Sequence, residues 1–511
     1  MNNRTNQLKR LVLAGTIAAM QLAAQVVWAD DSRTEELIRQ LQKRVEELEE
    51  KVKTLEAQRA PAGGTNGTPA TPQIEQLQQK VEDMQRRQEE ESQAAGERAR
   101  TLPKLSIGQD GFAMSSPNGD YKLQLEGVLQ VDSRTFFGNS QVVGDDAFLI
   151  RRARPILQGT VARDFDFLFV PDFAGTTPQI FDAYLNYKYS PALQLQAGKF
   201  KSPVGLEQLV LDRDLIFDER ALPTDLAPNR DVGFELHGEL FSGRLNYGVG
   251  IFNGVGDARI SSNTSFENDK SFAGRIFVEP FKPEAGSPLR NLGVGVSGSF
   301  DRQQATNTSA LPATTGGTLA GFATVGQQQF FAYNPSGGAV VVANGDHWRL
   351  SPQGYYYYGP LGLLWEYVIS DQGVSRTAAK PLSSASLENT AWQVSGGWIL
   401  TGERAAYAGG VRPRRPFNPA AGGWGAWQVV ARYSELDVDH NAFPLFANPA
   451  SSASSAYGWE VGLNWYLNLN LKLGTSFAHT TFEGGGAGAT VPGVVTRKDE
   501  NVLFTRIQLA F

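Results

Sequence analysis

Two periodicities divide the hydrophobic and polar positions of this chain. Between residues 33 and 59, apolar side chains recur at the heptad spacing of a coiled-coil seam, with Glu, Arg, Lys and Gln between them. The seam consists of Ile38, Leu41, Val45, Leu48, Val52 and Leu55. From Leu102 onward the period changes to two, which predicts β-strands whose successive side chains point to opposite faces. We therefore expect a helical region followed, from residue 104, by an all-β domain.

The helical region is expected to have three parts. A coiled coil covers residues 30–59, a flexible linker rich in Gly, Ala, Pro and Thr covers 60–73, and a second short helical or coiled-coil segment covers 74–100. A single solvated helix packed on another surface is the alternative to the first coiled coil. β-branched residues at one seam position and leucine at the other favour a parallel dimer.

Sixteen segments after residue 120 alternate between apolar and polar side chains. They are 121–132, 146–162, 164–173, 179–189, 192–201, 230–240, 243–253, 270–281, 291–303, 346–358, 361–373, 390–401, 425–438, 456–467, 469–480 and 501–511. The number is even and the usual length is about ten residues, as in outer-membrane barrels. A soluble β-sandwich would alternate in the same way, so periodicity alone does not decide between the two folds.

The connections between the segments alternate in length and favour the barrel. Asp164, Ser190-Pro191 and Asn468 mark short turns, and the long connections are 202–229, 254–269, 304–345, 374–389 and 481–500. Short periplasmic turns and long extracellular loops are typical of outer-membrane barrels. Tyrosine and tryptophan also gather near segment ends, where aromatic girdles meet the membrane interfaces. We expect a transmembrane barrel of about sixteen antiparallel strands over residues 104–511.

Both ends of the sequence indicate export. Residues 1–29 resemble a secretory signal peptide, with a basic start, an apolar stretch and small residues at Val27 and Ala29; a membrane anchor is the alternative. Segment 501–511 ends on Phe511, similar to the signal by which the barrel assembly machinery recognises its substrates. We expect a Gram-negative outer-membrane protein that contacts lipid and lipopolysaccharide and has its N-terminal segment in the periplasm.

Composition narrows the classes of function. The chain has 47 basic and 53 acidic residues, no cysteine and four histidines. The acidic balance argues against a nucleic-acid partner, and the lack of cysteine argues against a thiolate metal site. No G-x-S-x-G motif is present, although His237 alternates inward with Asp231, Glu235 and Glu239 as a potential acid/base cluster. We expect no catalytic residue, no metal and no cofactor.

Several motifs resemble the family of phosphate-selective porins O and P. They are FLIRRARP at 148–155, IFDAYLNY at 180–187, GKFKSPVGLEQL at 198–209, DERALP at 218–223 and RDVGFELHG at 230–238. The resemblance spans nearly all of residues 104–511 in strand order. It implies a homotrimer of sixteen-stranded barrels, a third extracellular loop (202–229) folded into the lumen, and a basic path for anions. The dimer preference of the coiled-coil seam conflicts with a trimer.

The resemblance also implies which residues line the anion path. Guanidinium groups bind phosphate bidentately, and a narrowed lumen focuses their field. Arg151 lies on the lipid face by strict alternation and needs a bulge or snorkelling to reach the lumen, while Lys199 and Lys201 need a bulge. The candidate pore-lining residues are Arg151, Arg152, Arg154, Asp182, Lys199, Lys201, Ser202, Arg213, Arg220 and Arg230. A charge cluster at the extracellular rim is the alternative for the arginines.

Acidic residues in the loop at 202–229 count against a strongly basic path. Six acids face two arginines there, a balance of −4. These acids either pair with wall arginines and brace the loop, or set weak or cation-leaning selectivity. We expect passive diffusion of small anions, with phosphate or polyphosphate as the candidate solute and a general or cation-leaning porin as the alternative. From another class, an envelope protein that uses the coiled coil as a periplasmic or peptidoglycan tether is the alternative.

Overall fold

The computed structural model describes residues 79–80, 83–84, 86–87, 89–90, 93, 101–108, 111–138, 145–261, 263, 269–304, 319–334, 340–376 and 383–511. The chain forms two compact units, Met1–Leu102 and Pro103–Phe511. The described residues between 79 and 93 are helical. The predicted signal peptide (1–29), coiled coil (30–59) and linker (60–73) lie outside the described residues. None of the described helices is long and apolar enough to span a membrane.

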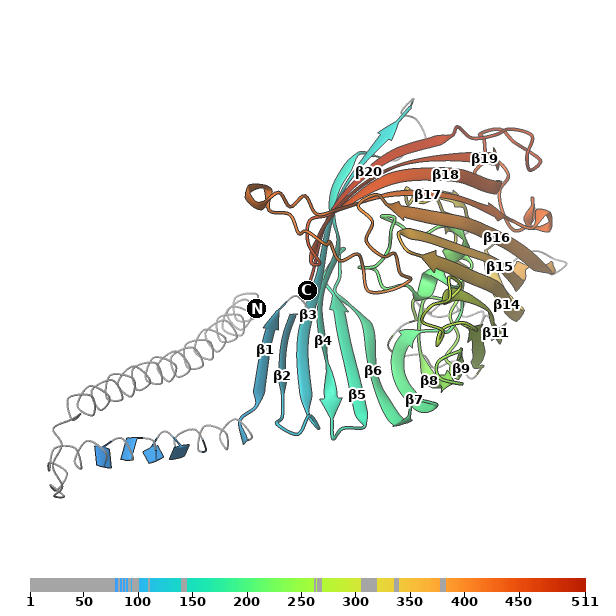
Figure 1. Cartoon of the computed structure of the whole chain (residues 1–511). Helices are drawn as coiled ribbons and strands as arrows, with labels where there is room; N and C mark the ends of the chain where they lie inside the picture. The colour runs from blue at the N-terminus through green and yellow to red at the C-terminus, as the bar shows by residue number, and fades with distance from the viewer. Residues whose placement is uncertain are drawn as a thin grey trace, which may run out of the picture. The chain divides into compact units, whose positions relative to one another are not determined.

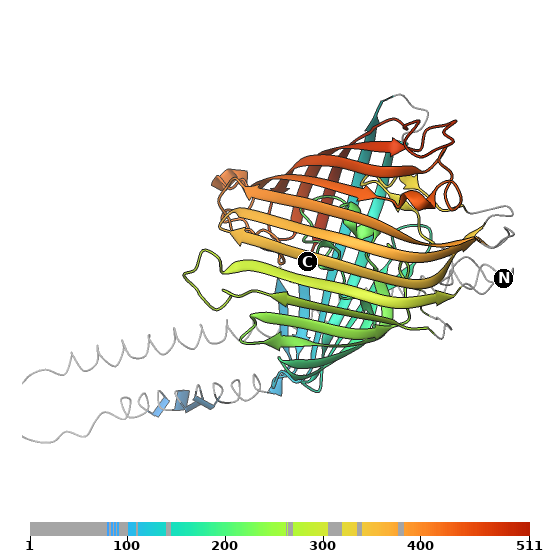
Figure 2. The same cartoon turned by 90° about the vertical axis from the view of Figure 1, so that its right-hand side faces the viewer.

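Sixteen antiparallel strands of the second unit close into a barrel (Figures 1 and 2). The strands are β3 (Lys122–Phe137), β4 (Ala147–Val161), β5 (Phe165–Asp172), β6 (Gln179–Ser190), β7 (Leu193–Lys201), β8 (Arg230–Leu240), β9 (Leu245–Phe252), β10 (Ser271–Val278), β11 (Asn291–Gln304), β14 (Val341–Tyr358), β15 (Leu361–Arg376), β16 (Ser384–Ile399), β17 (Ala426–Asp437), β18 (Ala453–Tyr466), β19 (Leu471–Gly484) and β20 (Glu500–Ala510). Each pairs with the next, and β20 pairs with β3. Closure leaves no strand edge in lipid, where unpaired backbone groups cost several kcal/mol each. The predicted barrel and its strand number are confirmed.

Short elements occupy the connections. They are the hairpin β12 (Phe322–Ala323) and β13 (Gln329–Phe331), and the 3-10 helices η1 (Glu207–Leu209), η2 (Leu222–Asp225), η3 (Pro419–Ala421) and η4 (His440–Ala442). Helices η1 and η2 lie in the loop between β7 and β8, and the hairpin lies in the connection between β11 and β14.

A hairpin that the sequence pattern did not predict precedes the barrel. It consists of β1 (Lys104–Gly108) and β2 (Gly111–Ser115), and β2 lies beside the first part of β3 (Figure 1). β20 pairs with Val128–Phe137 of β3, so the first part of the predicted segment 121–132 lies outside the closing seam. Barrel strands are staggered, and the stagger leaves the start of β3 with a free edge that β2 covers.

Alternation places apolar side chains outside the barrel and polar ones inside. On β20, Leu503, Ile507 and Leu509 are exposed, whereas Arg506 and Gln508 are buried. A soluble sandwich would show the opposite arrangement, with its apolar face buried against a second sheet. The exposed apolar face is therefore the surface that meets lipid.

Phe511 packs at the junction between β20 and β3. Its N–H donates to the carbonyl of Gly127 (3.1 Å), and the N–H of Gly127 donates to the carbonyl of Phe511 (2.9 Å). Its ring meets Phe112 edge to face at 6.2 Å between centroids. A Cβ atom on Gly127 would lie 2.8 Å from the Phe511 ring, so this close approach requires glycine.

We expect Phe511→Ala to lower the free energy of unfolding by about 2–4 kcal/mol, because it removes a packed ring at the closing seam. The measurement is the urea concentration at the midpoint of unfolding. The folded and unfolded barrels are distinguished by their different mobility on a gel. Phe241→Ala is the matched control, since that ring is 72% exposed in a turn. Equal midpoints for Phe511→Ala and the control would contradict the role of Phe511.

Candidate functional site

Residues 202–229 leave β7, cross the lumen and return to β8, and we call them the lumen loop. Its backbone carbonyl groups accept hydrogen bonds from inward-facing side chains of three strands on the opposite wall, β18 to β20. Asn464 donates to Ile216 (2.7 Å), Lys472 donates to Leu215 (2.8 Å) and Gln508 donates to Arg213 (2.9 Å). Residues 213–216 of the lumen loop are thus fastened to the opposite wall.

The start of the lumen loop is held by β15 and β16. Glu366 accepts hydrogen bonds from the backbone N–H groups of Leu206 (2.6 Å) and Glu207 (3.4 Å). Gln393 donates to both Glu366 (2.6 Å) and the Glu207 side chain (2.9 Å). These polar side chains are buried, so their mutual bonds offset part of the loss of hydration.

A bulge in β4 brings Arg151 into the lumen. Gln130 of β3 pairs with Arg152 and Val131 pairs with Ile150, so Arg151 is the extra residue between them. Its guanidinium reaches Glu219 of the lumen loop through two hydrogen bonds, of 2.5 and 2.9 Å. Of the two routes considered for Arg151, the bulge is therefore the one that occurs.

Glu219 is the centre of one carboxylate–arginine cluster. Besides Arg151, it binds Arg134 at 2.9 Å and Arg506 at 3.4 Å. Arg506 also binds Asp132 at 2.6 Å. Burial raises the pKa of Glu219, but the attraction of Arg151 and Arg152 outweighs it, so the pKa lies well below its ordinary value. Glu219 therefore stays ionised in mild acid.

Asp212 is the centre of a second cluster, between the lumen loop and β4. It pairs with Arg220 at 2.6 Å, with Arg152 at 3.4 Å and, in a closer contact, with Arg154. Burial again raises its pKa, and the attraction of Arg152, Arg220 and Arg154 overcomes this and holds the pKa well below the usual range. Loop acids thus pair with wall arginines and brace the loop.

A second bulge turns Phe181 of β6 toward the lumen. Val170 pairs with Asp182 while Pro171 pairs with Ile180, which leaves Phe181 as the extra residue. Its ring lies between two guanidinium groups, at 3.9 Å from Arg154 and 4.5 Å from Arg230. Arg230 in turn pairs with Asp182 at 3.2 Å.

The other candidate residues lie at several places. Lys201 donates to the carbonyl of Val210 in the lumen loop (2.7 Å), and Arg213 pairs with Glu126 of β3 (2.7 Å). Lys199 turns instead to the β9–β10 connection, where it donates to the carbonyl of Ser261 (2.8 Å) and the side chain of Asn263 (3.0 Å). Ser202 is buried at the start of the lumen loop.

Simple counting, which placed both lysines on the lipid face, is wrong. The residue before Lys199 is Gly198, whose φ of 135° is a conformation that L side chains rarely adopt. The strict alternation of β7 ends at this point, and Lys199 is buried. Lys201 reaches the lumen loop without the bulge considered at this end of β7, since the pairing of β7 with β8 runs without a register shift from Gln194 to Lys201.

The part of the lumen beside β14–β19, toward the β11–β14 connection, is filled by apolar side chains. Phe322, Phe330 and Phe331 of the β12–β13 hairpin pack there with Leu222 and Leu226 of the lumen loop, and inward-facing residues of β15–β19 join them. Phe322 and Phe331 stack at 5.2 Å between ring centroids. This apolar cluster is a packed core and leaves little room for water.

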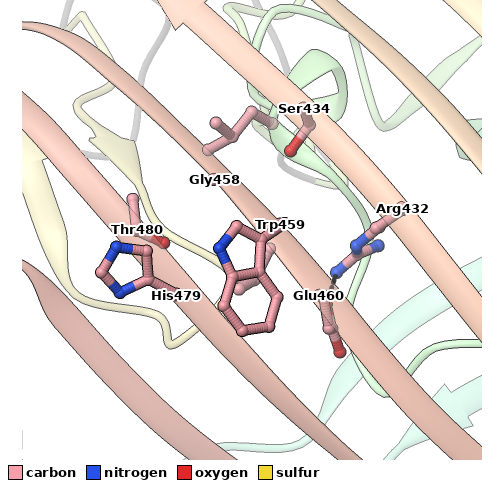
Figure 3. Close-up of a pocket in the computed structure, with 9 residues that line it drawn as sticks. Arg432, Ser434, Gly458, Trp459, Glu460, His479 and Thr480 are labelled. Carbon is pink, nitrogen blue, oxygen red and sulfur yellow. Dashed lines mark hydrogen bonds and ion pairs between the residues drawn. The ribbon is translucent and has the colours of Figure 1, made fainter.

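The wall below this cluster is also closed. Figure 3 shows Arg432 and Glu460, from adjacent strands, pointing toward one another, and their ion pair is 2.5 Å long. The cavity beside them has a volume of about 10 Å³, which admits at most about one water molecule. Arg432 also donates to the carbonyl of Glu219 (2.8 Å), which ties the lumen loop to β17.

The opposite side of the lumen loop is open. A cavity of about 510 Å³ lies between this loop and strands β5–β10. It is lined by charged residues of both signs and by amides and tyrosines, among them Asp182, Lys201, Arg230, Glu235, Glu239 and Arg275. We call it the lumen cavity. It has the volume typical of small-molecule sites in proteins.

Comparisons with known proteins agree with this architecture. The family model "Phosphate-selective porin O and P" matches residues 123–511, which is more than half of the chain. The chain belongs to this porin family. It is therefore an outer-membrane channel protein, and the predicted location in the outer membrane is confirmed. No curated protein sequence matches the chain.

Solved structures similar to this porin are outer-membrane proteins. They include the channel DcaP of Acinetobacter baumannii, with 12% identity, a TM-score of 0.47 and coverage of 76% of this chain and 97% of that one. OmpT of Vibrio cholerae, in its trimer form, has 11% identity, a TM-score of 0.46 and coverage of 76% and 99%. The anion-selective porin from Comamonas acidovorans has 12% identity, a TM-score of 0.45 and coverage of 76% and 100%.

Sequence reasoning missed several residues that hold the lumen loop of this porin. Arg134 and Arg506 bind Glu219 from two neighbouring strands, and Asp132 braces Arg506. Asp132 and Arg506 are polar residues on the inward side of strands that the pattern did predict, whereas Arg134 lies two residues beyond the predicted segment 121–132. Nothing in the sequence indicated their shared partner on a loop far along the chain.

Asp225 joins the lumen loop to the β12–β13 hairpin. It accepts a hydrogen bond from the N–H of Ala323 (2.8 Å). Burial raises the pKa of Asp225 to about 7, against the lowering effect of this N–H and with a further increase from Asp257. The group therefore binds more protons in the folded chain than in the unfolded chain between pH 4 and 7.

We expect the free energy of unfolding to fall as the pH rises from about 4 to about 7 and to level off above that range, because ionising buried Asp225 is unfavourable. Asp225→Asn should remove up to about 4 kcal/mol of this dependence. The measurement is the unfolding free energy of both proteins at pH 5 and pH 8. Asp269→Asn, at an exposed loop position, is the control. If the unfolding free energy of Asp225→Asn changes between pH 5 and pH 8 by as much as that of the wild type, the assignment is overturned.

Proposed function

We propose that this porin mediates the passive diffusion of small anions, with phosphate or polyphosphate as the candidate solute, and that it acts as a homotrimer. Solutes take the side of the lumen loop that faces β5–β10. Two observations support this route: the lumen cavity lies there, and the opposite side is filled by the apolar cluster and by bonds from the wall to the loop.

The observation that carries the anion preference is the charge at one rim of the lumen cavity, where the lumen loop meets β4, β7 and β8. Five cationic side chains gather there, and four carboxylates pair with some of them. The cations are Arg152, Arg154, Lys201, Arg220 and Arg230, and the carboxylates are Asp172, Asp182, Asp212 and Glu219. Asp182, Lys201 and Arg230 of this group line the cavity itself. The formal balance of +1 at a narrowed, low-dielectric site attracts anions.

A general or cation-leaning porin is the second candidate, and a specific observation favours it. Glu219 and Asp212 pair with the wall arginines, so these guanidinium groups are not free to receive phosphate. Glu235 and Glu239 add negative charge deeper in the lumen cavity. The two candidates therefore differ in whether the rim or the deeper wall controls the ion current.

The deciding experiment is the reversal potential of single channels in a KCl gradient, with and without added phosphate. The anion proposal expects a potential of the sign set by chloride, and a chloride current that falls as phosphate enters the lumen. A cation-selective current that phosphate leaves unchanged would establish the second candidate instead.

Deleting the N-terminal residues 30–100 distinguishes a channel from an envelope tether. We propose that they lie in the periplasm, and that Phe511 and its strand address the chain to the barrel assembly machinery. A porin without residues 30–100 should keep its single-channel conductance, whereas a tether should lose its attachment to the cell envelope. Gel filtration of the detergent-solubilised protein with light scattering tests the trimer.

A further inference from the structure

We propose that the lumen cavity binds zwitterionic solutes of the amino-acid or short-peptide class. The proposal goes beyond anion diffusion, because it assigns to this cavity a solute that carries both charges. It rests on the proposed function in one respect only, which is the route of solutes past the lumen loop.

The first support is a pair of carboxylates that the fold leaves without partners. Glu235 and Glu239 face the cavity from β8, two inward positions apart. Within the described part of the chain, neither carboxylate group accepts a hydrogen bond or forms an ion pair. A side chain at Gly248 of β9 would collide with Oε1 of Glu235, so this glycine makes room for the carboxylate.

The second support is a pair of cations bound to neutral atoms alone. Arg275 of β10 donates to the amide oxygen of Gln353 at 3.3 Å and lies over the ring of Phe277 at 4.3 Å. Lys201 donates to the backbone carbonyl of Val210. Among the described residues no carboxylate lies within ion-pair distance of either cation, and both cations line the cavity.

Opposite charges that face one cavity without pairing favour a solute that matches both. A simple anion would be attracted by Arg275 and Lys201 but repelled by Glu235 and Glu239. A simple cation would be attracted by the two carboxylates and repelled by the two cationic side chains. A zwitterion places its ammonium group on a carboxylate and its carboxylate on the guanidinium, so each group gains a charge-assisted hydrogen bond. Amides such as Gln194 and Gln196 complete the polar lining and suit a peptide group.

The size of the cavity sets an upper bound on the solute. About 510 Å³ accommodates a small molecule with some of its water shell, which fits an amino acid or a dipeptide. The site is a passage that solutes enter and leave, so weak binding is sufficient for selection.

Swelling of proteoliposomes in alanine, glycerol and lactate tests the proposal. These three solutes are close in size and are zwitterionic, neutral and anionic respectively. We expect the ratio of alanine to glycerol influx to fall about threefold in both Glu235→Gln and Arg275→Gln, the loss of roughly one solvated charge contact. Lactate influx should rise in Glu235→Gln and fall in Arg275→Gln. Glu284→Gln, an exposed residue of the β10–β11 turn, is the control.

An alanine-to-glycerol ratio that stays at the wild-type value in both variants would refute the zwitterion site. A parallel change of alanine and glycerol would refute it too, because it would reflect pore size alone. Glu235→Gln preserves the shape of the side chain, so it decides the matter even where Arg275→Gln fails to fold. Failure of the proposed anion function appears separately, as a cation-selective reversal potential in KCl with the swelling ratios unaffected.

Discussion

Replacing Glu219 with glutamine is expected to shift the ion current strongly toward anions. The change removes the carboxylate that pairs with Arg151 and Arg134 and approaches Arg506. Three guanidinium groups then face the lumen with less compensation. The added positive potential should raise the ratio of anion to cation permeability roughly three- to fivefold, the effect of about one unit charge at close range in a hydrated pore. The measurement is the reversal potential in a KCl gradient.

The same substitution should weaken the attachment of the lumen loop. Breaking a buried ion pair from one side costs about 3–5 kcal/mol, since the remaining charges stay buried. We therefore expect larger current fluctuations in addition to the change in selectivity. Glu284→Gln serves again as the exposed control, with no effect on either quantity. Unchanged selectivity in Glu219→Gln would mean that this cluster lies outside the path of the ions.

Replacing residues 305–340 with a short Gly-Ser turn is expected to raise the single-channel conductance at least about twofold. The deletion removes Phe322, Phe330 and Phe331 from the apolar cluster and so opens the part of the lumen beside β14–β19. It also removes the hydrogen bond between Ala323 and Asp225 that holds the lumen loop. Conductance rises with the open cross-section of a water-filled barrel, so the change should be large.

A loop deletion elsewhere provides the comparison for this variant. Shortening 486–494, in the mostly exposed connection between β19 and β20, should leave the conductance at the wild-type value. If the hairpin deletion conducts like the wild-type porin, the apolar cluster does not restrict the flow of ions.

The strands were predictable because their signal is local. Each barrel strand shows its two faces within about ten residues, and the boundaries of β8, from Arg230 to Leu240, match the predicted 230–240. The β1–β2 hairpin escaped prediction because five-residue strands carry too few alternations to distinguish them from a loop. The closing register escaped for a different reason, since the stagger of a barrel is set by all its strands together.

The sequence predicted which charged residues lie in the lumen better than it predicted which of them form ion pairs with one another. The sequence placed Arg152 and Arg154 on an inward face, and it offered a bulge for Arg151, which the register of β3 and β4 confirms. It also offered a braced loop, but it could not choose Glu219 and Asp212 as the two acids that do the bracing. Those partners come from strands and a loop far apart in the chain, and a register shift of one residue would exchange them.

The structure moves the candidate site of solute selection to another part of the lumen. Sequence reasoning put selectivity on the arginines of β4, whereas the structure binds these to loop acids and leaves the open volume beside β5–β10. Arg275, which the sequence did not single out as pore-lining, faces that volume. Its signal is the same inward alternation on β10 that any barrel strand shows, so nothing local marked it.

Cysteine accessibility tests most directly whether solutes pass between the lumen loop and β5–β10. The natural chain has no cysteine, so each introduced thiol is the sole target. Gln196→Cys places a thiol on the lumen cavity, and Gln428→Cys places one on the closed side, where the native side chain is 3% exposed. We predict that a charged methanethiosulfonate reagent changes the single-channel current of Gln196→Cys and leaves that of Gln428→Cys unaltered. Modification that changes the current of Gln428→Cys and spares Gln196→Cys would contradict this route through the porin.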